Sequence, residues 1–111
     1  MEISQEEVSG FTCVTMSGRL DAGTTPDAEK IFEDIQNSGK LGVLLDLGGL
    51  EYISSVGLRV ILTLVKELGM KGGKVVLCSL SDYVKEIFEV SGFTAIIPIA
   101  ETVDAGIETL S

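Results

Sequence analysis

Short apolar segments alternate with amphipathic stretches along the chain, and this alternation predicts its secondary structure. Val14 and Met16 alternate with polar residues in a stretch rich in β-formers, which is typical of a half-buried strand. Pro98 cannot donate a ladder hydrogen bond, so the last apolar stretch is expected at a sheet edge. The pattern predicts five strands, at residues 3–8, 11–17, 42–47, 74–79 and 95–99.

Between the strands, apolar residues recur with the spacing of a buried helical face. Thr25 is expected to cap the first helix, with Pro26 as its first residue. Helices are predicted near residues 25–37, 55–70, 81–91 and 101–110. The buried stripes are predicted to be Ala28, Ile31, Phe32 and Ile35 in the first helix, and Leu58, Ile61, Leu62, Val65 and Leu68 in the second.

Strands that alternate with helices predict an α/β fold with mostly parallel pairing. We expect a single domain over residues 1–111, built on a four- to five-stranded mixed β-sheet with helices packed against it. Residues 48–57 read as a loop between the third strand and the second helix. The pairs Gly48-Gly49 and Gly72-Gly73 complete no phosphate-binding motif, so both are interpreted as turn glycines.

Composition narrows the function classes. Apolar residues make up 45% of the chain, enough for a buried core, and the net charge of −9 disfavours nucleic acid and anionic membranes. The absence of histidine removes His-based triads and most catalytic zinc sites. No stretch is long and apolar enough to span a membrane, and the N-terminus lacks a signal-peptide pattern. We therefore expect a cytoplasmic protein without cofactor or metal.

Four residues have side chains that could form a disulfide, bind a metal or take part in catalysis. Cys13 and Cys78 lie in separate strands and are interpreted as buried free thiols rather than a disulfide or a metal site. Asp21 follows a strand, where it fits either a Mg²⁺ or phosphoacceptor site or a turn in which it accepts bonds from nearby amides. Asp46, inside an apolar strand, is expected to play a structural role because no base, nucleophile or metal partner accompanies it.

The stretch "EYISSVGLR" places two serines where a helix begins. Ser54 or Ser55 would cap that helix, and capping alone explains one of them. A phosphoryl group on a serine here would also be tolerated, since the positive end of the helix favours negative charge. Both interpretations stay open on the residues alone.

Three segments together resemble the STAS domain of bacterial anti-sigma factor antagonists. "VLLDLGGLEYISSVGLRVIL" resembles the family's strand, serine step and amphipathic helix, and "GRLDAGTTPDAE" is similar to its Gly-x-Leu-Asp segment with a following threonine. "KVVLCSLSDYVKEIFEVSGF" is similar to its next strand–helix unit. The resemblance covers nearly the whole chain.

This resemblance implies a non-enzymatic regulator. Its unphosphorylated form would bind an anti-sigma factor that is also a serine kinase and thereby release a sigma factor, and a PP2C-type phosphatase would reverse the phosphorylation. Aligning Gly57 with the family motif places the phosphoacceptor on Ser55, with Ser54 as the alternative. Asp21, Thr24 and Arg59 would belong to the environment of the phosphorylation site, together with Ser54 and Gly57.

One position departs from the family pattern. Many regulated members have Asp directly before the acceptor serine, where this chain has Ser54. The change would weaken recognition by the kinase or move the acceptor to Ser54. The alternative function is a STAS module that binds a partner constitutively, without phosphorylation, in another signalling or transport assembly.

Overall fold

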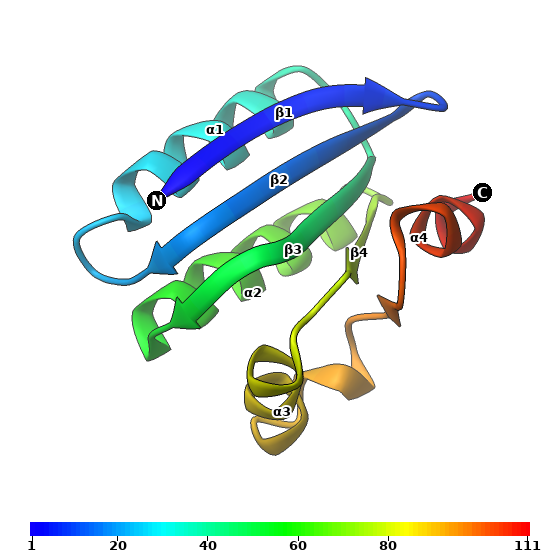
Figure 1. Cartoon of the computed structure of the whole chain (residues 1–111). Coiled ribbons are helices and arrows are strands. Elements are labelled where there is room, and N and C mark those ends of the chain that lie inside the picture. Colours follow the sequence, from blue (N-terminus) through cyan, green and yellow to red (C-terminus); the bar gives the residue numbers. More distant parts are fainter.

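Five strands form one mixed sheet in the computed structural model, which describes all 111 residues (Figure 1). β1 pairs antiparallel with β2, and every later pair in the order β1-β2-β3-β4-β5 is parallel. The elements are β1 (Glu2–Val8), β2 (Phe11–Leu20), α1 (Thr25–Asn37), β3 (Gly42–Ile53), α2 (Ser55–Met70), β4 (Lys74–Cys78), α3 (Asp82–Val90), the 3₁₀ turn η1 (Phe93–Ala95), β5 (Ile99–Ala100) and α4 (Val103–Leu110). The predicted α/β class and mixed sheet are confirmed.

Helices cover both faces of the sheet. The larger core lies on one face, where Phe32 of α1, Leu64 of α2 and Phe88 of α3 pack against strand residues. On the opposite face α4 covers a smaller cluster that contains both cysteines. Figure 1 shows α1 and α2 behind β1 to β3, and α4 apart from them beside β4. Ser81 caps α3, its hydroxyl accepting the backbone N–H of Val84 at 3.3 Å.

The expected loop at residues 48–57 is wrong, because β3 continues to Ile53. An irregularity in the β2–β3 register makes this possible: Thr15 pairs with Asp46, but Ser17 pairs with Gly49. The strands approach closely there, and a Cβ on Gly49 would lie 2.7 Å from that of Ser17. Gly49 is therefore a strand glycine at a bulge rather than a turn glycine. Gly72 does lie in a turn, at a φ of +83°.

The expected strand at residues 95–99 is also wrong in most of its length. Phe93–Ala95 forms η1, and the carbonyl of Phe93 accepts hydrogen bonds from Ile96 and Ile97. Only Ile99–Ala100 joins the sheet. Pro98 lacks an N–H, yet its carbonyl accepts the N–H of Leu77 at 3.0 Å, which ties the segment to β4.

The buried stripe of α2 differs from the prediction. Leu64, which was not predicted, is buried, whereas the predicted residues Leu58, Leu62 and Val65 are only partly buried. The helix is apolar on more than one face, so spacing alone does not choose between neighbouring stripes. In α1 the predicted stripe is confirmed except at Ile31, which is partly buried.

Candidate functional site

The carboxyl ends of β2 and β3 meet at one edge of the sheet because the two strands are parallel. The loop after β2 contains Asp21 and Thr24, and Ser54 follows β3 directly. The N–H of Ser54 donates to the carbonyl of Leu20 at 2.9 Å, which fastens one chain segment to the other. The two segments that the sequence singled out are thus brought together at the start of α2 (Figure 1).

Ser54 is the N-cap of α2. Its backbone is extended, and its Oγ accepts the N–H of Gly57 at 3.1 Å. Its carbonyl accepts the N–H of Leu58 at 2.9 Å, the first hydrogen bond of the helix. The side chain is half-buried. Capping therefore accounts for Ser54 completely.

Ser55 is the first residue of α2, and it is exposed. Its hydroxyl takes part in none of the side-chain hydrogen bonds of the structure. It lies in the first turn, where backbone N–H groups lack partners within the helix and the helix dipole is positive. The geometry thus presents a free hydroxyl beside an electropositive backbone.

Asp21 and Thr24 form a closed hydrogen-bonded turn. The Asp21 carboxylate accepts the N–H of Gly23 at 3.0 Å, which matches the turn interpretation of this residue. The Thr24 hydroxyl accepts the N–H of Asp21 at 2.9 Å and donates to the carbonyl of Arg19 at 2.8 Å. Thr24 occupies the N-cap position of α1 without capping it, and the helix begins at Thr25. The expected cap at Thr25 is therefore wrong, because both threonines bond backward into the loop.

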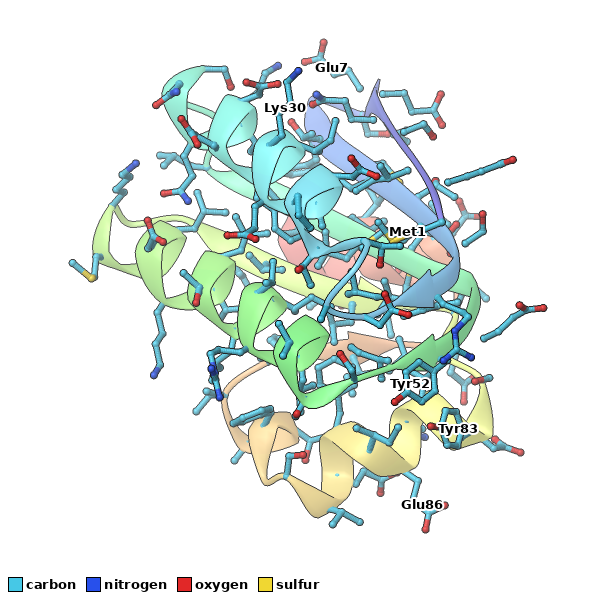
Figure 2. The ribbon with its side chains drawn as sticks, turned by 90° about the vertical axis from the view of Figure 1, so that its left-hand side faces the viewer. Met1, Glu7, Lys30, Tyr52, Tyr83 and Glu86 are labelled. Carbon is cyan, nitrogen blue, oxygen red and sulfur yellow. The ribbon has the colours of Figure 1, made fainter.

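Arg19 and Tyr52 were not predicted as site residues, yet their side chains join the ends of β2 and β3. They are partners in the β2–β3 register, and the Arg19 guanidinium lies 4.1 Å from the centroid of the Tyr52 ring. The Nε of Arg19 is also 3.6 Å from a carboxylate oxygen of Asp21. Figure 2 shows Tyr52 and Tyr83, from β3 and α3, at this end of the molecule. Only the pairing of β2 with β3 could have predicted this contact. That pairing contains a bulge, which the sequence does not reveal.

Gly57 and Arg59 lie in the first turns of α2. Gly57 is buried against Leu20, with no room for a side chain. Arg59 is exposed and lies four residues after Ser55, so it shares one side of the helix with it. Gly57 therefore lets the helix pack closely against β2, and Arg59 places a positive charge near the start of the helix.

Asp46 and the two cysteines lie away from this edge. The Asp46 carboxylate accepts the N–H of Gly48 at 3.0 Å, which fits a structural role. Cys13 and Cys78 are buried and free, as expected. Burial raises the pKa of Cys78 to about 11 and also raises the pKa of Cys13, and the charge of Asp46 adds to both effects. These thiols are therefore poor nucleophiles at neutral pH.

Two further chemical features of the chain concern metals and membranes. No group of three or more His, Cys, Asp or Glu side chains is arranged to hold a metal ion. None of the helices combines the length and apolar character that crossing a membrane requires.

The chain is similar in sequence to curated bacterial proteins. BtrV of Bordetella bronchiseptica, named as a candidate anti-sigma factor antagonist, is 36% identical over 95% of this chain and 90% of its own length. The anti-sigma F factor antagonist of Paenibacillus polymyxa is 32% identical over 89% of this chain and 86% of its own.

The fold is shared with solved structures of the antagonist SpoIIAA. The unphosphorylated form has a TM-score of 0.82 and 22% identity, covering 97% of this chain and 95% of that one. The phosphorylated form, from Bacillus, has a TM-score of 0.78 and 19% identity, covering 99% and 100%. The family model described as the STAS domain matches residues 2–106. Because this match spans nearly the whole length, the chain belongs to the STAS domain family.

Proposed function

We propose that this protein is a cytoplasmic anti-sigma factor antagonist that is switched off by phosphorylation of Ser55. In the unphosphorylated state it binds an anti-sigma factor, which is also its serine kinase, and so releases a sigma factor. A PP2C-type phosphatase restores the free serine. The names of the curated relatives support the antagonist role. The exposed Ser55 hydroxyl at the start of α2 is the observation that carries the switch.

Ser55 is favoured over Ser54 by the hydrogen bonds of the two residues. A kinase acting on Ser54 would have to break the bond between its Oγ and the N–H of Gly57 and reach a half-buried atom. The Ser55 hydroxyl has no such bond to lose, and its side chain is accessible. A phosphoryl group attached there would lie beside the unpaired N–H groups of the first helical turn.

The switch acts through charge and shape at a docking surface. Asp21 and Thr24 fix the neighbouring loop, and Val56, which is 38% exposed, and Arg59 flank the acceptor. A phosphoryl group adds almost two negative charges to a chain with a net charge of −9. It also adds bulk where the partner would touch the helix start. Both effects weaken docking without unfolding the domain.

The decisive experiment incubates the protein with its cognate kinase and ATP and reads phosphorylation by intact mass. We expect the mass increase in wild type and Ser54→Ala, and none in Ser55→Ala, which should still bind the kinase. Ser55→Asp should fold but bind poorly, and only in part mimic phosphate because it adds one charge. Ser81→Ala, which removes a capping serine from α3, is the matched control and should be phosphorylated normally.

Three outcomes would overturn parts of the proposal. A mass increase that survives in Ser55→Ala but is lost in Ser54→Ala would move the acceptor to Ser54. No increase with an active cognate kinase would leave a constitutive binding module. The protein alone should hydrolyse neither ATP nor phosphoesters, and robust turnover that is lost in Asp21→Ala or Asp46→Ala would favour an enzyme instead.

A further inference from the structure

A groove of about 410 Å³ runs between α1 and α2 on the outer side of the two helices. Its apolar residues are Phe32 and Leu64, which are only 4% and 1% exposed and form the floor, and the partly buried Val60. The remaining lining is polar or charged: Glu29, Glu33, Gln36 and Asn37 from α1, Thr63 and Glu67 from α2, and Lys71 directly after α2. The groove therefore combines a short apolar strip with acidic walls.

The carboxylates of this groove are not neutralised within the chain. The two salt bridges of the structure, Arg19–Asp21 and Lys40–Glu7, lie elsewhere. Glu29 and Glu33 are four residues apart on α1, a like-charge spacing that destabilises a helix. The acidic walls are thus not explained by the stability of the fold.

One cationic side chain of the protein already reaches the groove. The Nζ of Lys71 donates to Oε1 of Gln36 at 3.2 Å, joining the two helices at one end. Lys71 stands four residues after Glu67, yet it forms no salt bridge with it. Counting Glu29, Glu33 and Glu67 against Lys71, the lining keeps a net charge of −2.

We infer that this groove is a docking site for a basic amphipathic helix of a protein partner. Lysine or arginine side chains of that helix would meet the three glutamates, and its apolar residues would meet Val60 above the floor that Phe32 and Leu64 form. Helices commonly bind in grooves through apolar residues at i, i+3 and i+4 spacing. A small-molecule site is disfavoured because such pockets are lined mainly by apolar residues, whereas only three of these ten are hydrophobic.

The groove lies along the same helix that begins with Ser55 but is separate from the phosphorylation site. Its first α2 residue, Val60, is five residues beyond Ser55, which corresponds to about 7 Å along a helix axis. A partner could contact the helix start and the groove at once. Binding of a helix in the groove does not depend on phosphorylation of Ser55. The docking inference and the proposed switch can therefore be disproved separately.

The test uses the full ¹⁵N-labelled chain and a synthetic peptide of about 15 residues, with lysines on one helical face and leucines on the other. We expect amide shifts concentrated in residues 29–37 and 60–71. The triple variant Glu29→Gln, Glu33→Gln, Glu67→Gln should bind roughly tenfold more weakly. The matched triple Glu86→Gln, Glu89→Gln, Glu108→Gln removes the same charge from α3 and α4 and should bind like wild type.

Several results would overturn the inference. Equal weakening in both triple variants, or shifts spread over the whole acidic surface, would show attraction to net charge alone. Equal binding of a peptide with glutamate in place of lysine would remove the role of the carboxylates. Shifts in the groove on diluting the chain without peptide would instead identify a second copy as the occupant. The titration uses the unphosphorylated chain without any kinase, so its outcome does not depend on the proposed switch.

Discussion

Gly57 in the first turn of α2 packs directly against Leu20, the last residue of β2. A Cβ on Gly57 would lie 2.7 Å from the carbonyl oxygen of Leu20 and 2.8 Å from its Cγ. The same carbonyl accepts the N–H of Ser54 at 2.9 Å. The start of α2, and with it Ser55, is therefore held against the end of β2 at a spacing that only glycine allows.

Replacing Gly57 with alanine should destabilise the protein by about 1–3 kcal/mol, since backbone and a buried side chain must shift to admit the methyl group. Gly69→Ala, later in the same helix, is the matched control. No atom lies within 4 Å of the added Cβ there, and alanine should stabilise the helix by roughly 0.5–1 kcal/mol. Urea unfolding of both variants measures the difference. Similar free energies of unfolding for the two would contradict the close packing at Gly57.

The two adjacent serines should differ in what they contribute to stability. Ser54→Ala removes the hydroxyl that accepts the N–H of Gly57 and should cost about 1 kcal/mol. Ser55→Ala removes an exposed hydroxyl without a partner and should change the free energy of unfolding by less than about 0.5 kcal/mol. Thermal or urea unfolding of the single variants provides the comparison. A larger loss of stability in Ser55→Ala than in Ser54→Ala would mean that Ser55, and not Ser54, caps the helix.

The hydroxyl of Thr24 should stabilise the loop after β2. Thr24→Val keeps the shape of the side chain but leaves the N–H of Asp21 and the carbonyl of Arg19 without this partner. We expect a loss of about 1–2 kcal/mol in urea unfolding. Thr109→Val, which removes an exposed hydroxyl that donates to the carbonyl of Ala105 in α4, should have little effect. Equal effects of the two substitutions would rule out a special role for the Thr24 bonds.

Sequence patterns predicted the helices well because capping residues and apolar spacing are local signals. Pro26 and the apolar stripe predicted α1 within its observed bounds, and only the identity of the N-cap residue was displaced, from Thr25 to Thr24. Helix α4 begins at Val103 rather than 101, since Thr102 takes the capping position and accepts the N–H of Ala105. In α1 neither threonine hydroxyl caps the helix, because both donate back into the loop, so a hydroxyl residue alone does not mark the first helical residue.

The bounds of the strands were harder to predict, because the end of a strand depends on pairing partners far away in the sequence. Gly48 and Gly49 carry a turn signal, yet pairing of Gly49 with Ser17 on β2 keeps β3 extended to Ile53. The pairing of Arg19 with Tyr52 follows from the same bulged register. The sequence was sufficient to select the motif residues Asp21, Thr24, Ser54 and Ser55. It was not sufficient to predict the contact between Arg19 of β2 and Tyr52 of β3.

Protonation of Cys78 should make stability depend on alkaline pH. Burial, with a contribution from Asp46, raises the pKa of this thiol from its ordinary value of 9.0 to about 11. The unfolded thiol therefore loses its proton near pH 9, while the folded one keeps it until about pH 11. Because the unfolded state binds fewer protons in this interval, the free energy of unfolding falls as pH rises from 9 to 11. Below pH 9 both states are protonated, and this contribution is fully present.

Urea unfolding at pH 8, 9, 10 and 11 tests this dependence in wild type and Cys78→Ala. The alanine variant should be less stable at pH 8, since it leaves a small cavity under α4. Its stability should nevertheless decline less between pH 9 and 11, because it lacks the titrating thiol. The two proteins share every other ionisable group, so the difference between the two curves isolates Cys78. Parallel curves would mean that the thiol ionises equally in the folded and unfolded states, and that solvent reaches it beneath α4.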